Sequence, residues 1–149
     1  MPISIPVRVY YEDTDASGVV YHAAYLRYFE RARTEWVRSL GLSQQALMQE
    51  FGVAFTVSAL SVEYLRPARL DDLLQVDAAV DNIRRASLEF VQTVVREDGA
   101  VLARAHAHVA CVSTARFRPC GLPAGLRERM ALGSMENSAS GMTTERSGT

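Results

Sequence analysis

The chain opens with a segment in which apolar and polar residues alternate. Residues 3–10 (ISIPVRVY) place Ile or Val at every second position as far as residue 9. A period of two residues is typical of a half-buried β-strand. The polar, glycine-containing stretch 12–18 (EDTDASG) that follows has no such period. We therefore expect a strand and then a loop in which no regular element persists.

From about Ala23 to Leu40 the apolar period lengthens to that of an α-helix. Charged residues fill most positions between the apolar ones, and Arg31 and Glu35 form an i,i+4 pair. Gly41 is a typical C-terminal stop. The apolar face comprises Tyr25, Tyr28, Phe29, Ala32, Trp36 and Leu40.

A short second helix is expected from Ser43 to about Glu50. The Ser43 side chain is a good N-cap, whereas Ala46, three residues on, cannot complete a capping box. Near the C-terminus, residues 127–130 (RERM) predict a further short helix.

The remaining periodic segments predict strands. They are rich in Val, Leu and aromatic residues, and Asp98-Gly99 is a hairpin signal between the last two. One strand, a long helix and four strands together predict an α+β fold with an antiparallel sheet. The four strands are expected at residues 53–65, 73–83, 86–96 and 100–113.

The length of 149 residues fits a single domain, which we place at residues 1–132. Residues 133–149 (GSMENSASGMTTERSGT) are small and polar without periodicity. Such a composition buries too little apolar surface to offset the entropy lost on ordering, so a disordered tail is expected there.

The overall charge and composition exclude several classes of protein. The net charge of −1 gives no general attraction to nucleic acid or to an anionic membrane. No apolar run approaches the roughly 20 residues of a transmembrane helix, and the N-terminal residues do not resemble a signal peptide. The two cysteines, Cys111 and Cys120, do not form the framework of a secreted domain, and neither has an adjacent His. A cytoplasmic protein without an integral membrane segment is expected.

The loop before the long helix carries the densest candidate chemistry. Glu12, Asp13 and Asp15 place three carboxylates within four residues, just before a helix start that offers unpaired backbone N–H groups. A carboxylate there could attack an acyl group or activate water, while the N–H groups stabilise the developing oxyanion. Acidic residues before a helix also serve as caps and loop formers, which is the commoner role when spacing is the sole guide.

The segment YYEDTDASGVVYHAAYLRYFERARTEW (10–36) resembles the signature of the 4-hydroxybenzoyl-CoA thioesterase family of hotdog proteins. Within it, the similarity is greatest to the bacterial Tol–Pal-associated acyl-CoA thioesterases. The likeness continues through LSQQALM (42–48), VEYLRPARLDDLL (62–74) and the hairpin strands. The resemblance implies a hotdog fold, in which an antiparallel sheet wraps around a long central helix.

The resemblance also implies roles for individual residues. Asp15 corresponds to the catalytic carboxylate, acting as nucleophile through an acyl-enzyme anhydride or as general base toward water. The backbone N–H of His22 would be the oxyanion donor, and the His22 side chain would orient substrate or water. Ser17 stands where this branch often has Gly, and would be strained if the position required a positive φ. Substrate-binding positions are expected at Tyr11, Gly18, Val19 and Tyr21.

Several other residues with reactive or charged side chains are open to a binding role or to a plain surface role. Arg84 and Arg85, like Arg66 and Arg69, lie at predicted turns and suit CoA phosphates. His106 and His108 share one face of a strand, but the sequence offers no third ligand, so no metal site is expected. The chain has no phosphate-binding Gly loop, Gly-x-Ser-x-Gly elbow or nucleotide fingerprint, and no cofactor is expected.

Hydrolysis of an acyl-CoA thioester to free acid and CoA is thus the leading functional hypothesis. The resemblance further implies a homo-oligomer, a dimer or a tetramer, with active sites at the subunit interface. The alternative is an interaction protein of the Tol–Pal context, binding acyl carrier protein or phospholipid-synthesis enzymes with little turnover. A hotdog dehydratase is a third hypothesis, weakened because no dehydratase-type His motif is present.

Overall fold

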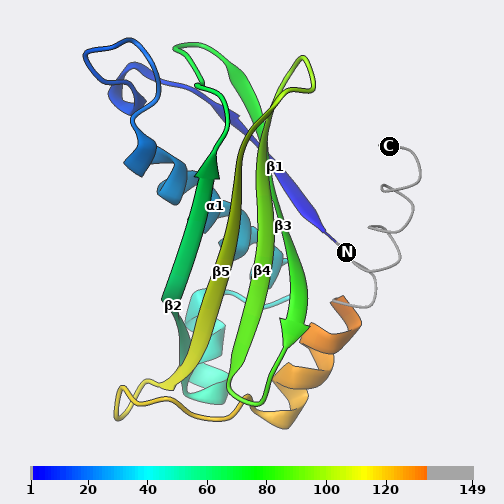
Figure 1. Cartoon of the computed structure of the whole chain (residues 1–149). Helices are drawn as coiled ribbons and strands as arrows, with labels where there is room; N and C mark the ends of the chain where they lie inside the picture. Colours follow the sequence, from blue (N-terminus) through cyan, green and yellow to red (C-terminus); the bar gives the residue numbers. More distant parts are fainter. Residues whose placement is uncertain (1, 134–149) are drawn as a thin grey trace.

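The computed structural model describes residues 2–133 and shows one antiparallel sheet curved around a long helix (Figure 1). The sheet order is β1-β3-β4-β5-β2, and all four pairings are antiparallel. This is the α+β hotdog arrangement expected from the sequence. The strands are β1 (Ile3–Arg8), β2 (Val53–Tyr64), β3 (Leu73–Ile83), β4 (Ser87–Arg96) and β5 (Val101–Ser113).

The central helix α1 spans His22–Arg38 and follows the predicted apolar face closely. Its buried residues pack chiefly against β3 and β1, and the Trp36 ring meets Phe90 of β4 edge-on at a centroid distance of 5.5 Å. Such aromatic pairs add about 0.5–1.5 kcal/mol beyond area burial. Leu40 lies beyond the helix end and is half-buried, because the chain turns at Gly41, where φ is +83°.

The second helical segment differs in part from the prediction. The Ser43 hydroxyl accepts the Ala46 N–H at 3.0 Å, as expected for an N-cap. The α-helical part, α2, is short (Gln44–Ala46) and continues as a π-helical turn, η2 (Leu47–Phe51). Gly52, in the left-handed conformation, ends it by donating its N–H to the carbonyls of Leu47 and Met48.

Two other local elements depart from the sequence-based expectation. A 3-10 turn, η1 (Tyr11–Asp13), forms where no regular element was predicted, because the Asp13 carboxylate accepts the Tyr10 N–H and closes the turn. The C-terminal helix is longer than predicted and covers 124–133, burying Leu126 and Met130. The predicted disordered tail, apart from Gly133, lies outside the described residues.

Strand β2 forms one edge of the sheet, and its two ends lie beside different parts of the molecule. Among the described residues its partner is β5, which leaves its other edge unpaired over 12 residues. At one end of β2, Tyr64 lies near the loop that precedes α1. The other end of β2, at Val53, lies at the same end of the sheet as the β3–β4 turn (Figure 1).

Candidate active site

Asp13 anchors the loop between β1 and α1. Its side chain is buried, with the residue 6% exposed, and its carboxylate accepts the Tyr10 N–H at 2.9 Å. The same carboxylate pairs with the Arg27 guanidinium of α1 at 3.1 Å, and the Asp13 carbonyl accepts the Tyr21 N–H at 2.8 Å. One residue therefore ties the strand end, the loop and the helix together.

Asp15, two residues later, points into solvent. The Ser17 hydroxyl and the Ser17 backbone N–H, the latter at 2.9 Å, both donate to Oδ1 of Asp15. These two hydrogen bonds, with a smaller contribution from the nearby His22, hold the pKa of the Asp15 carboxyl below its ordinary value. Asp15 is therefore ionised at neutral pH, as a nucleophile or general base must be.

A tight turn presents this carboxylate. The Gly18 N–H donates to the Asp15 carbonyl at 3.0 Å, and the Asp15 N–H donates to the Val19 carbonyl at 3.0 Å. Gly18 takes the left-handed conformation with φ of +82°, whereas Ser17 does not have a positive φ. The serine that departs from the branch pattern is therefore accommodated without backbone strain, and it holds the carboxylate in place.

The first turn of α1 lies beside this loop. Within residues 2–133, neither the His22 nor the Ala23 backbone N–H has a hydrogen-bond acceptor, as is usual for a helix start. The Tyr64 hydroxyl donates to the His22 carbonyl at 3.0 Å, and the His22 ring lies near Tyr21 and Tyr64, at centroid distances of 4.7 and 5.9 Å. The end of β2 thus holds the first turn of α1 in place. The N–H groups of His22 and Ala23 at that turn are available to bind an oxyanion.

An open hollow of about 600 Å³ adjoins both groups. Asp15, Val19 and His22 line one side of it, and the chain from Tyr64 to Pro67 lines another. A second hollow of about 510 Å³ lies against Asp15 as well and includes Tyr11 and Gly18. Asp15 therefore stands between two hollows, within reach of a substrate in either.

The structure brings most of the predicted site residues together. Asp15, Val19 and His22 share the first hollow, Tyr11 and Gly18 join Asp15 in the second, and the Tyr21 ring lies beside that of His22, tilted at 41°. Tyr11 is 82% exposed, so it is not a core residue.

Arg84 and Arg85 lie elsewhere in the same chain. They form the β3–β4 turn, at the end of the sheet away from Asp15 (Figure 1), and Arg84 pairs with Glu89 at 3.2 Å. One chain by itself does not bring these arginines to Asp15.

Sequence reasoning did not identify Tyr64 as part of the site. Tyr64 fixes the first turn of α1, and Tyr25 of that helix accepts the Ala68 N–H through its hydroxyl at 3.1 Å. Arg66, which was considered for phosphate binding, lines the hollow with them. Tyr64 and Arg66 lie in the stretch 62–74 that resembles the family, so that likeness was the available signal.

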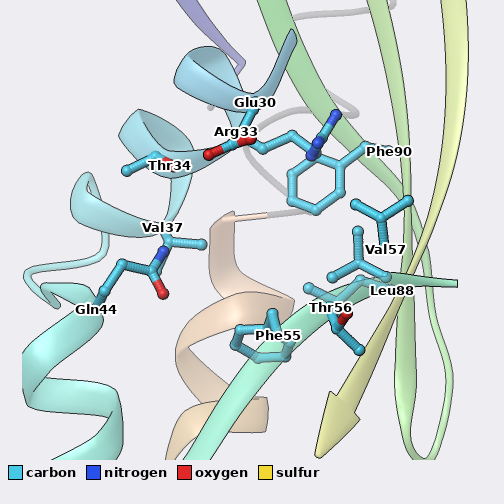
Figure 2. Close-up of a pocket in the computed structure, with 11 residues that line it drawn as sticks. Glu30, Arg33, Thr34, Val37, Gln44, Phe55, Thr56, Val57, Leu88 and Phe90 are labelled. Carbon is cyan, nitrogen blue, oxygen red and sulfur yellow. The ribbon is translucent and has the colours of Figure 1, made fainter. Parts of the chain in front are cut away.

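A third hollow, of about 370 Å³, opens beside the other end of β2 (Figure 2). Arg33 and Thr34 of α1 face Phe55 and Val57 of β2 across it. The Arg33 guanidinium donates to the Gln92 Oε1 at 2.9 Å, and burial lowers the pKa of Arg33. The hollow combines a half-buried cation and the Glu30 carboxylate with apolar side chains from β2 and β4.

The thioesterase superfamily model matches residues 17–103 of this chain, which is more than half of it. The chain belongs to the thioesterase superfamily. Acyl-CoA thioesterase YbgC of Haemophilus influenzae is 48% identical over 120 residues, 80% of this chain and 88% of that protein. Acyl-CoA thioester hydrolase YbgC of Escherichia coli O157:H7 is 51% identical over 118 residues, 79% of this chain and 87% of that protein.

Solved structures agree with the fold of this superfamily member. A probable thioesterase from Bartonella henselae is 31% identical with a TM-score of 0.76, over 83% of this chain and all of that chain. A 4-hydroxybenzoyl CoA thioesterase mutant complexed with 4-hydroxybenzoyl CoA is 21% identical with a TM-score of 0.80, over 87% and 98% of the two chains. At that identity the second likeness supports the fold alone, and both confirm the hotdog architecture.

Two further findings concern the buried cysteine and the helices of this superfamily member. Burial, followed by the contact with Cys120 at 3.7 Å, raises the pKa of the Cys111 thiol to about 12, so Cys111 is protonated and unreactive at neutral pH. Over residues 2–133, no helix combines the length and the apolar character needed to cross a bilayer.

Proposed function

We propose that this protein hydrolyses acyl-CoA thioesters to the free acid and CoA, with Asp15 as its catalytic carboxylate. One observation carries the proposal. An exposed, ionised Asp15 lines the same hollow as the start of α1, whose first two N–H groups have no acceptor among the residues that the structure describes. The relatives named acyl-CoA thioesterase or thioester hydrolase support this choice of substrate class.

Two chemical routes use the same residues. In the first, an Asp15 oxygen attacks the thioester carbonyl carbon, the C–S bond breaks, and CoA leaves as a thiolate that takes up a proton. Water then hydrolyses the acyl–Asp15 anhydride to the free acid. In the second, Asp15 removes a proton from water as the water attacks the same carbon. The C–S bond then breaks, and CoA leaves as a thiolate that takes up that proton, which restores the Asp15 carboxylate. Oδ1 of Asp15 is engaged by Ser17, so Oδ2 is the freer oxygen in either route.

The negative charge that develops on the thioester oxygen requires donors that are already in place. The N–H groups of His22 and Ala23 at the start of α1 are suited to this, and the helix dipole adds to their effect. The His22 side chain, held between two tyrosine rings, would orient the substrate or the water. Tyr64 would act as a positioning residue, because its hydroxyl holds the His22 carbonyl.

Pairing of two β2 edges would complete the site. An antiparallel pairing about a twofold axis places the Tyr64 end of one β2 beside the Val53 end of the other. The Asp15 hollow of one subunit would then adjoin the Arg33 hollow of its partner. The same pairing moves the partner's β3–β4 turn toward Asp15, so Arg84 and Arg85 would bind CoA phosphates across the interface.

We therefore propose a homo-oligomer, a dimer or a pair of dimers, acting in the cytoplasm. Cys111 is a buried thiol rather than part of a disulfide framework, which fits a reducing compartment. An acyl group carried by acyl carrier protein would present the same thioester to Asp15 as acyl-CoA does. Association with the Tol–Pal system stays a prediction from the resemblance.

A panel of aliphatic and aromatic acyl-CoA substrates, with a thiol reagent to detect released CoA, tests the proposal. The wild type should release CoA from at least one substrate, and Asp15→Asn should not. Glu12→Gln is the matched control, because Glu12 is an exposed carboxylate of the same loop that accepts no hydrogen bond among the described residues. If no substrate yields CoA, or if Asp15→Asn is as active as the wild type, the proposal fails. Acyl carrier protein thioesters belong in the same panel.

A further inference from the structure

The outer face of the sheet, opposite α1, carries a second cluster of ionisable groups. Along β5, Ala105, Ala107 and Val109 are buried in the core, so His106 and His108 project to the other face. The register of β4 on β5 places Glu89 directly opposite His108. Sequence spacing did not reveal this third group, because it comes from the neighbouring strand, 17 residues before His106.

The donor atoms of the three side chains converge. Glu89 Oε1 lies 3.3 Å from His108 Nδ1, and Glu89 Oε2 lies 3.9 Å from His106 Nε2. One donor atom from each side chain lies within 4.8 Å of the other two. Donors bound to a Zn²⁺ ion at ~2.1 Å stand ~3.4 Å apart in a tetrahedral site. Side-chain movements of about 1 Å would therefore close the three donors around one ion.

Glu89 is unusual for a carboxylate on a sheet surface because it is only 7% exposed. A carboxylate so far removed from water needs a compensating cation. Arg84 supplies one at 3.2 Å, but its own side chain is 60% exposed and is free to swing into solvent. A divalent ion held by the two imidazoles would provide the same compensation at shorter distance.

We propose that Glu89, His106 and His108 form a binding site for a first-row transition metal ion such as Zn²⁺ or Ni²⁺. Two imidazole nitrogens and one carboxylate oxygen suit these ions, whereas Mg²⁺ and Ca²⁺ require mainly oxygen ligands. Water would occupy the remaining coordination positions. The site lies on the face of the sheet that does not contact α1, and it shares no residue with the hollow that Asp15 lines. Its consequence is a link between β4 and β5 that stabilises the folded chain increasingly, with the logarithm of the ion concentration once the site is near saturation.

Titration of untagged, chelator-treated full-length protein with Zn²⁺, Ni²⁺ and Mg²⁺, followed by calorimetry and thermal unfolding, tests the site. We expect one Zn²⁺ or Ni²⁺ per chain, with a raised melting temperature, and no binding of Mg²⁺. His106→Gln and His108→Gln should each weaken binding at least about tenfold. His22→Gln removes the remaining histidine of the 149-residue chain and should leave the affinity unchanged.

The Arg84→Gln variant separates a metal site from a plain ion-pair network. It alters an exposed side chain and removes the cation that competes for Glu89, so it should bind Zn²⁺ several-fold more tightly than the wild type. Unchanged or weaker binding by Arg84→Gln would overturn the proposal. So would the absence of saturable Zn²⁺ and Ni²⁺ binding by the wild type, or wild-type affinity in folded His106→Gln and His108→Gln variants.

Discussion

Asp13 and Asp15 lie two residues apart in one loop, yet their surroundings are opposite. Asp13 is buried and bonded to the strand end and to α1, while Asp15 is exposed and bonded to its own turn. The chemistry of the two side chains is identical, so their different roles follow from position alone. A carboxylate that is fully engaged in holding the fold together cannot also take up a proton or an acyl group.

The path of the chain explains the difference. Thr14, between the two aspartates, forms a bridge with Val20, which closes the loop at its base. Asp13 lies on the inner side of that bridge, against α1. Residues 15–18 lie on the outer side, where the turn at Gly18 holds Asp15 away from the core. The loop therefore has a structural base and an exposed tip, which carries the proposed catalytic carboxylate.

The largest expected effect is at the tip. Asp15→Asn keeps the shape and the acceptor oxygen for Ser17 but removes the charge and the proton acceptor. We expect kcat/KM for acyl-CoA hydrolysis to fall by about 10²–10⁴-fold, with an unchanged melting temperature because the side chain is exposed. A fall in activity accompanied by a lower melting temperature would mean that Asp15 also supports the fold.

The reciprocal change is at the base. Asp13→Ala leaves the Tyr10 N–H and the Arg27 guanidinium without their partner, which should cost about 1–3 kcal/mol in the free energy of unfolding. Urea denaturation measures this cost. Activity should also fall, through displacement of the Asp15 turn, but less than in Asp15→Asn. Full stability in Asp13→Ala would contradict the structural role assigned to the base.

A smaller effect is expected for the partner of Asp13. Arg27→Met keeps the aliphatic stem and removes the charge of a side chain that is 53% exposed. Solvent screens the exposed Arg27 guanidinium and so weakens its attraction to Asp13. The loss in unfolding free energy should therefore be about 1 kcal/mol or less. Comparing Arg27→Met and Asp13→Ala with the double variant gives the pair's own contribution.

The smallest effect concerns Ser17, and it should show itself in the pH dependence. The Ser17 hydroxyl lowers the pKa of Asp15, and the active form of Asp15 is the carboxylate. In Ser17→Ala the pKa of Asp15 should rise, so the acidic limb of the activity profile should move to higher pH. Near pH 7, above the pKa in both proteins, the rates should differ by only a few-fold. A limb that stays in place would show that the serine hydroxyl does not act on Asp15.

Much of the architecture could be predicted from local patterns. The three- and four-residue spacing of Tyr25, Tyr28, Phe29, Ala32 and Trp36 predicted α1 to within one residue at its start. The strand bounds were predicted to within two residues, and the cap at Ser43 was predicted correctly. Each of these features depends on neighbours a few residues away, which the sequence displays directly.

The roles within the loop were less accessible. Three carboxylates before a helix marked the segment as notable, and the resemblance to a family selected Asp15. The burial of Asp13 could not be inferred, because it depends on where α1 crosses the end of β1. The 3-10 turn Tyr11–Asp13 was missed too, although the hydrogen bond that closes it joins residues only three apart, because a turn of three residues has no hydrophobic period.

By itself, then, the sequence determined the order and approximate extent of the strands and of α1, and it marked the loop in which we propose that the chemistry resides. Tertiary structure decided which carboxylate is buried, placed Arg84 and Arg85 away from Asp15, and set Glu89 beside His106 and His108. The physical reason is that periodicity encodes which face of an element meets the core. Strand register and chain crossings arise instead from contacts between residues far apart in the chain, which no local spacing records.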